Sequence, residues 1–322
     1  MLAGRNPARG IAHAELLVAA DATEVSFVEL DVLDRSACEQ FLRAVRPDLV
    51  IQAACYFSPW AFASLDTVAV RGLRHVGFGV QLPFQAACVR SLMLAVREVG
   101  FAGPVVNCSY PDATNTLLAH EGLAPTIGVG NVGMMQARVE ALLRNEPDLL
   151  VRMIAHHSQT VSVMTGLALP LDLQPRVYLG ASGMRRDELA HRGRAFEWSI
   201  ATNLLTAAVA VPVIRALLPN GLALRASVPG VRGLPGGYPV RITRGTIDLD
   251  LPPNVELEDA VAYNLRAGEL DGIRSISDGV AYWTRAAEVA LRAVHPALAE
   301  PLASADCLQR AYLLTAALKL PY

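Results

Sequence analysis

The stretch from Pro104 to Arg138 constrains the fold of this chain most strongly. It holds a short β-branched run, then a polar loop at residues 107–112, and later a glycine turn at residues 128–133 that opens a helix. Short apolar runs bounded by Pro, Gly and Asn are typical of buried strands. In an open parallel sheet, ligands collect where loops leave the carboxyl ends of strands. We therefore expect chemistry at the loop 107–112.

Strands and helices alternate on the amino-terminal side of this stretch. Residues 24–32 alternate as a strand, residues 49–54 (LVIQAA) form a continuous apolar strand, and residues 82–99 indicate a long helix. A continuous apolar strand is typical of a parallel sheet covered on both faces. The alternation predicts a Rossmann-type parallel-sheet domain over residues 1–148.

Residues 149–322 follow a different pattern and predict a second domain. After a strand at 149–155, the pattern predicts a helix at 198–218 and an antiparallel pair of strands at 238–242 and 246–251. Further helices are expected at residues 257–266, 282–294 and 306–318. The expected fold class is α/β, with an α+β substrate and dimerisation domain after the Rossmann-type domain.

Composition excludes several classes of function. The formal net charge of −2 gives no basic footprint, so we expect no nucleic-acid partner. The most apolar run, residues 200–218, is interrupted by Asn203, Pro212 and Arg215, which favours a core or interface helix over a membrane span. The five cysteines are scattered and form no CxxC pair, which argues against a disulfide frame or a metal site. With no secretory leader in view, a cytoplasmic protein is expected.

Two adjacent histidines, His156 and His157, are the best acid–base candidates because they follow an apolar strand. An adjacent pair is expected to turn one ring inward, so metal binding by both is not expected. We predict that His157 is the cleft base and lies within about 10 Å of Tyr110 or Arg138; a structural histidine is the alternative. Arg138 could clamp a carboxylate with two hydrogen bonds or form a surface salt bridge.

Cofactor candidates come from the strand ends. Arg5 follows a short apolar run and would suit the 2′-phosphate of NADP, although a solvated arginine explains it as well. Ala54 and Cys55 end a central strand and could line a nicotinamide, or could be a plain strand end. The run 128–133 (GVGNVG) has the spelling of a dinucleotide fingerprint, but we favour a tight turn with close packing. Cys108 lacks the His–Asp spacing of a nucleophile.

The order of elements from residue 49 to residue 292 resembles the lactate/malate dehydrogenase superfamily. Tyr110-Pro111-Asp112 stands at the family's asparagine-proline-valine-aspartate motif, with Thr114 or Thr116 as its threonine. The turn 128–130 with Arg138 is similar to the family's glycine turn and arginine, and 155–158 (AHHS) to the stretch with its catalytic histidine, where His157 matches best.

This resemblance implies an NAD(P)-dependent oxidoreductase that acts on a small carboxylate-bearing metabolite. His157 and Arg138 would be catalytic, while the substrate residues would be Tyr110, Arg71, Arg74 and Thr202. Residues 25–55 also resemble extended short-chain dehydrogenases, where an Asp-Val step meets adenine. The cofactor set, for NAD or NADP, is then Arg5, Asp31, Val32, Ala54, Cys55 and Asn107.

Two departures from the family pattern support a rival hypothesis. Tyr110 replaces the family's asparagine, and Met135 replaces the aspartate that orients the histidine. Without that carboxylate we expect a His with no fixed tautomer and a lower pKa. The rival is a redox-inactive ligand-binding or partner protein on the same fold.

Two expectations concern assembly and the first strand. The helix 198–218 is apolar nearly all round, so we expect a homodimer or tetramer through it. Residues 2–6 (LAGRN) resemble the end of the second strand of a dinucleotide-binding domain. We therefore expect the first strand, its glycine-rich loop and its helix to be missing, which would leave apolar edges on residues 2 and 49–54 and weaken NAD(P) binding.

Overall fold

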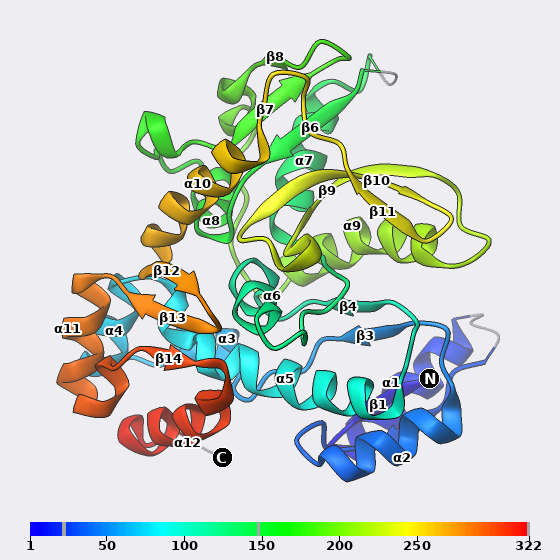
Figure 1. The fold of residues 1–322 in the computed structure, drawn as a ribbon, viewed down its shortest axis with the longest axis vertical. Coiled ribbons are helices and arrows are strands. Elements are labelled where there is room, and N and C mark those ends of the chain that lie inside the picture. The colour runs from blue at the N-terminus through cyan, green and yellow to red at the C-terminus, as the bar shows by residue number, and fades with distance from the viewer. Residues whose placement is uncertain (21–23, 147–148, 321–322) are drawn as a thin grey trace.

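The computed structural model describes residues 1–20, 24–146 and 149–320 (Figure 1). They form an α/β fold of helices around several small sheets, some parallel and some antiparallel. The strands are β1 Leu2–Gly4, β2 Phe27–Glu29, β3 Val50–Gln52, β4 Val105–Asn107, β5 Ile127–Gly128, β6 Val151–Ile154, β7 Arg176–Leu179, β8 Met184–Arg185, β9 Leu224–Pro229, β10 Gly237–Thr243, β11 Thr246–Leu249, β12 Ile273–Ser277, β13 Val280–Trp283 and β14 Leu302–Ala303. The helices are α1 Pro7–Ala19, α2 Arg35–Val45, α3 Pro59–Ser64, α4 Val68–His75, α5 Leu82–Val99, α6 Pro111–Ala119, α7 Asn131–Leu142, α8 His157–Thr165, α9 Thr202–Leu217, α10 Leu257–Gly268, α11 Arg285–Val294 and α12 Cys307–Leu318.

The parallel strands come from the first part of the chain. β1 pairs with β2, while β3, β4 and β5 form a separate sheet in that order. These strands are shorter than their apolar patterns predicted: β2 covers Phe27–Glu29 of the expected 24–32. The loop after β4 leads directly into α6, so residues 108–110 lie at the carboxyl end of a buried central strand, as expected.

The later strands pair in antiparallel fashion. The hairpin of β10 and β11 matches the predicted pair, and β9 adds to its other side. The expected helix 282–294 is wrong at its start, because Tyr282 and Trp283 belong to β13, which pairs with β12. The side chain of Thr284 then caps α11 by accepting a hydrogen bond from the Ala287 amide at 3.3 Å.

Two hydrophobic clusters flank the site. One joins α3, α4 and α5 to β12, β13, α11 and α12, so the last third of the chain packs on helices of the first. The other joins β4 and β5 to α9 and the β9–β11 sheet. Figure 1 shows α6 in the middle, between these two groups of elements. The expected domain boundary at residue 148 falls outside the described residues.

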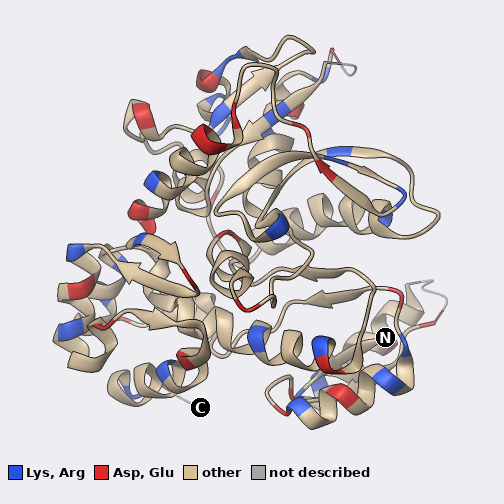
Figure 2. Cartoon of the chain, viewed as in Figure 1, with Lys and Arg blue, Asp and Glu red and all other residues tan. Residues whose placement is uncertain are grey.

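The segment Phe78–Val99 is long and apolar enough to cross a membrane, but 83% of its apolar 18-residue window is buried inside the fold. It contains α5, whose bounds match the predicted helix. Burial of this kind is typical of the central helix of a globular protein. The helix expected at 198–218 begins later, at Thr202, and carries a single charged side chain, Arg215 (Figure 2).

Candidate acid–base site

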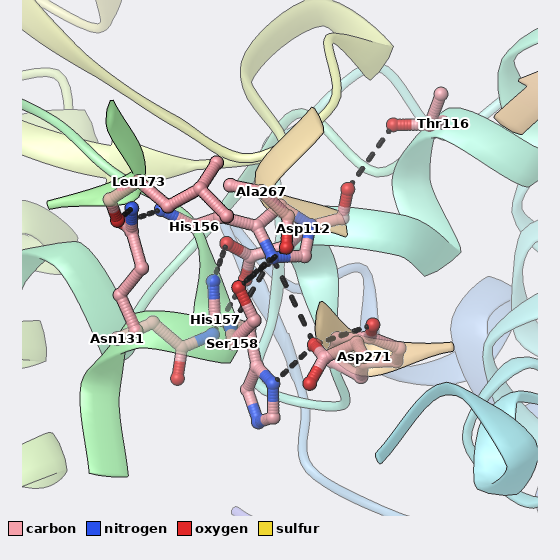
Figure 3. A network of polar contacts seen from close by, with 11 residues as sticks. Asp112, Thr116, Asn131, His156, His157, Ser158, Leu173, Ala267 and Asp271 are labelled. Carbon is pink, nitrogen blue, oxygen red and sulfur yellow. Dashed lines mark hydrogen bonds and ion pairs between the residues drawn. The ribbon is translucent and has the colours of Figure 1, made fainter. Parts of the chain in front are cut away.

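The candidate site is built on an ion pair between His157 and Asp271 (Figure 3). Nδ1 of His157 lies 2.7 Å from Oδ2 of Asp271, and the hydroxyl of Tyr110 donates to the same oxygen at 2.8 Å. His157 begins α8, Tyr110 ends the loop after β4, and Asp271 ends the 3₁₀ turn η5 (Glu269–Asp271). Three segments far apart in the sequence therefore converge on one carboxylate.

Burial sets the electrostatics of this pair. Asp271 is 4% exposed and Tyr110 is also 4% exposed. Burial opposes the charged imidazolium, but the Asp271 carboxylate outweighs it and raises the pKa of His157 above its usual value. Burial likewise favours a neutral Asp271, yet the facing imidazolium lowers the pKa of that carboxyl. Burial and the carboxylate together raise the pKa of Tyr110, which stays protonated and donates.

The ring of His157 has one nitrogen available to exchange a proton with a ligand. Because Nδ1 is bound to Asp271, the tautomer is fixed and Nε2 is the nitrogen that can accept or deliver a proton. The side chain is 16% exposed, so part of the ring reaches the surface of the fold. The ring centroid lies 4.7 Å from that of Tyr110, well inside the predicted 10 Å.

Asp112 holds the backbone of the site in place. Its Oδ1 accepts a hydrogen bond from the amide of His157 at 2.9 Å, which puts a carboxylate at the amino end of α8, where the helix dipole favours it. Its other oxygen accepts from the side-chain amide of Asn131, at the start of α7. Asp112 is 1% exposed, and it thereby ties α6, α7 and α8 together (Figure 3).

His156 is also buried, so the expectation that only one ring of the pair turns inward is wrong. The chain changes from strand to helix between the two residues, and this turn brings both rings toward Asp271. Nδ1 of His156 lies 3.8 Å from Oδ2 of Asp271, and it accepts a hydrogen bond from the Ser158 amide at 3.2 Å. Burial lowers the pKa of His156, in keeping with an unprotonated Nδ1 that caps α8.

Close backbone packing positions Asp271. A Cβ on Gly79 would lie 2.5 Å from the Asp271 carbonyl oxygen, and one on Gly77 would lie 2.3 Å from its carbonyl carbon. These glycines let the turn η1 (Phe78–Gln81) lie directly on η5. Phe78, which begins η1, lies beside the dyad, with its ring centroid 4.5 Å from that of His157.

The orienting carboxylate was missed by sequence reasoning. Its expected place, Met135, is fully buried in a hydrophobic cluster with Val163 and Val177. Asp271 supplies the carboxylate from 114 residues further along the chain, so the expectation of a His157 with no fixed tautomer and a lowered pKa is wrong. The Asp-Gly step at 271–272 signals a turn, and that turn was the available clue.

Tyr110 takes an unusual backbone conformation at the site. Its φ of 47° and ψ of 55° lie in the left-handed region, which costs a bulky residue on the order of 1–3 kcal/mol. Pro111 contributes because a following proline disfavours the right-handed helical region for the residue before it. The conformation aims the phenol at Asp271, so it serves the network rather than an open substrate pocket.

In the described part of the chain, the other predicted catalytic and substrate residues form no hydrogen bond or ion pair with the dyad. Nη1 of Arg138 donates to the carbonyl of Arg194 at 2.8 Å, and burial lowers the pKa of this guanidinium. Thr202 accepts a hydrogen bond from the Ser199 amide at 3.3 Å, at the start of α9. Arg71 pairs with Asp66 at 2.7 Å on the surface of α4, and Arg74 is exposed.

The predicted cofactor residues lie at or just after strand ends. Arg5 follows β1, Asp31 follows β2 and Cys55 follows β3. Burial raises the pKa of Cys55 to about 11, and the charge of Arg5 works in the opposite direction. The carbonyls of Val32 and Ala54 are hydrogen-bonded to Ser91 and Ser109. Asn107 ends β4 and is fully buried, and its side-chain amide donates a hydrogen bond to Asn115.

The glycine turn 128–133 packs against protein. A Cβ on Gly128 would lie 2.2 Å from Cβ of Pro111 and 2.7 Å from the carbonyl oxygen of Pro229. A Cβ on Gly133 would lie 3.4 Å from the carbonyl oxygen of Ser227. Since protein atoms occupy these faces, the turn gives close strand–helix packing, as favoured from the sequence.

Comparison with known proteins identifies no family model that matches the chain and no curated protein with significant sequence similarity. Function is therefore inferred from the geometry of the site.

Proposed function

We propose that this chain is an acid–base enzyme of the oxidoreductase class, in which His157 exchanges a proton with the oxygen of a small carboxylate-bearing substrate. The observation that carries the proposal is the 2.7 Å contact between Nδ1 of His157 and Asp271. A buried carboxylate that fixes the tautomer and raises the pKa of a histidine is the usual way to prepare a general acid or base.

In the reductive direction, His157 would give the proton at Nε2 to the substrate oxygen and become neutral. Asp271 stays ionised throughout, and Tyr110 holds it by hydrogen bonding. NAD or NADP, when bound, would supply the hydride that reaches the substrate carbon. Arg5, Asp31 and Cys55 support a cofactor crevice at the carboxyl ends of β1, β2 and β3, on a Rossmann-type arrangement.

The roles of Arg138, Arg71, Arg74 and Thr202 toward substrate stay predictions. Access to His157 would be past Phe78, whose ring centroid lies 4.5 Å from that of His157. The cavity beside Asp112 and His156 measures about 20 Å³, which is room for one water. We also propose a cytoplasmic protein and a homo-oligomer through α9, on which Leu204 and Val211 are exposed.

The rival proposal, a redox-inactive ligand-binding or partner protein, is favoured by one observation. Gly128 and Gly133, in the run spelled like a dinucleotide fingerprint, pack closely against Pro111, Pro229 and Ser227. A fluorescence titration with NADH and NADPH separates the two proposals. Binding, followed by oxidation of the reduced cofactor with a panel of 2-oxo acids, supports the enzyme; no binding by the intact chain supports the rival.

The role of His157 is tested with His157→Gln. The variant is expected to lose about 100-fold or more in turnover, since general acid–base catalysis typically contributes about 10²–10⁴-fold. His120→Gln is the matched control, because His120 also faces an aspartate, Asp278, at 4.0 Å but on the surface. Equal turnover in His157→Gln and the control would exclude His157 as the acid–base residue.

A further inference from the structure

The two parallel sheets each end on an open edge. In the described part of the chain, β1 pairs with β2 only, and the pairs of β3 are all with β4. The Leu2 amide donates to Ser26 at 2.7 Å, and the Gly4 carbonyl accepts from Leu30 at 3.0 Å. Leu2 and Gly4 therefore turn their peptide groups to β2, and by alternation Ala3 turns its own to the open edge.

The same alternation holds in β3. The Val50 amide donates to the Pro104 carbonyl at 3.0 Å, and the Gln52 carbonyl accepts from Cys108 at 2.8 Å. Ile51 therefore directs its N–H and C=O away from β4. Its side chain is 50% exposed, which is unusual for an isoleucine in a strand next to a buried central strand.

Both open edges belong to one layer. Helices α2 and α5 pack against each other and share a hydrophobic cluster with Leu30 and Val32 at the end of β2, and with Val50 in β3 (Figure 1). The Ser91 hydroxyl on α5 donates to the Val32 carbonyl at 2.6 Å, which ties the two-stranded sheet to that helix. Tyr56, which follows β3, donates its amide to the Phe84 carbonyl on the same helix at 2.8 Å, so the carboxyl ends of β2 and β3 both lie along α5. Because β1 is parallel to β2, its carboxyl end lies at the same end of the layer.

Apolar surface is exposed beside this break in the layer. Helix α1, which follows β1, leaves Ile11, Leu16, Leu17 and Val18 between 43% and 66% exposed. An exposed apolar helix face next to unpaired strand edges is what remains when a neighbouring strand and helix are absent from a layered α/β unit.

We propose that the space between β1 and β3 receives an additional parallel strand, which is carried on a segment that precedes Leu2 in the polypeptide and is followed by a helix packed on α1 and Ile51. The inserted strand would pair with Ala3 on one side and with Ile51 on the other. Because both faces would be covered, it must be almost entirely apolar. A strand–helix unit of this kind takes roughly 25–30 residues.

A second copy of this chain fits the space poorly. A two-fold axis pairs like with like, so β1 would meet β1 or β3 would meet β3 in antiparallel fashion. Neither arrangement joins an edge of β1 to an edge of β3. A strand in the same direction as both neighbours, connected by a helix to the start of β1, satisfies both edges at once.

The test compares residues 1–322 with the chain extended by the roughly 30 codons read in frame ahead of residue 1. The measurement is amide hydrogen exchange by NMR at Ala3 and Ile51. Both amides should exchange at least about 100-fold more slowly in the extended chain, whereas Val106, already paired in β4, should not change. Because exchange is read without cofactor, the result is independent of the proposed oxidoreductase activity.

Ile51→Pro provides the matched variant. Proline has no N–H. An open edge tolerates this loss, but an inserted strand needs the N–H for pairing, so this variant should cancel the protection of Ala3 in the extended chain. If the extended chain does not fold, a synthetic peptide of the upstream strand added to residues 1–322 gives the same readout. The proposal is overturned by unchanged exchange at Ala3 and Ile51, by the lack of an apolar in-frame segment, or by concentration-dependent protection of Ile51 in residues 1–322.

Discussion

Replacing Asp271 with asparagine tests the buried ion pair directly, because the two side chains have nearly the same size. The amide of the Asp271→Asn variant could still accept a hydrogen bond from Tyr110 but would leave the imidazolium of His157 without its counter-charge. Breaking a buried ion pair costs about 3–5 kcal/mol. The retained hydrogen bond offsets about 1 kcal/mol. We expect the free energy of unfolding to fall by about 2–4 kcal/mol near pH 6.

The pH dependence of this loss identifies its cause. The pKa of His157 is raised in the folded protein, so its contribution is fully present below the unfolded value of about 6.5 and is lost as pH rises through the folded value. The pKa of Asp271 is lowered, so its contribution is present above about 3.8 and is lost as pH falls through the folded value. The difference between wild type and Asp271→Asn should therefore be largest between about pH 4 and 6.5.

Urea unfolding followed by tryptophan fluorescence at about pH 5.5 and about pH 9.5 measures the difference. Asp278→Asn is the matched control: it breaks the His120–Asp278 pair, in which both side chains are more than half exposed, and should cost at most about 1 kcal/mol. A loss for Asp271→Asn that is the same at both pH values, or no larger than that of the control, would refute the ion-pair argument.

Three more predictions concern the residues that hold the dyad. Tyr110→Phe removes a donor to Asp271 and should lower the free energy of unfolding by about 1.5–3 kcal/mol in urea unfolding. Gly79→Ala should lower the free energy of unfolding by about 1–3 kcal/mol and move Asp271, because its Cβ would lie 2.5 Å from the Asp271 carbonyl oxygen. Gly72→Ala is the control: the space around Gly72 is open, so this change should not lower the free energy of unfolding. His156→Asn keeps a capping group for α8 but removes a buried histidine of lowered pKa. The wild type should lose stability as pH falls below about 6.5, and the variant should lose less, as measured by thermal unfolding across pH.

Local patterns in the sequence predicted the elements that local forces determine. The apolar spacing of residues 82–99 and the glycine that ends it give α5, and the alternation around Gly245 gives the hairpin of β10 and β11. His157 was predicted as a candidate because it follows an apolar strand, and β6 does end just before it.

The partner of His157 could not be predicted from local patterns. Asp271 lies in a single turn after α10, and it reaches the site only because Gly77 and Gly79 allow two turns to pack backbone on backbone. The family pattern predicted the orienting carboxylate at position 135, but Met135 is a core side chain in a hydrophobic cluster. The inward turn of both histidines likewise depends on a helix that begins at His157.

The most direct test of the central claim is an NMR titration of the His157 ring nitrogens in the wild type and in Asp271→Asn. We expect a pKa above about 6.5 in the wild type, with the proton of the neutral form on Nδ1, and a lower pKa in the variant. A wild-type pKa at or below that of Asp271→Asn would contradict the proposal that Asp271 prepares His157 for proton transfer.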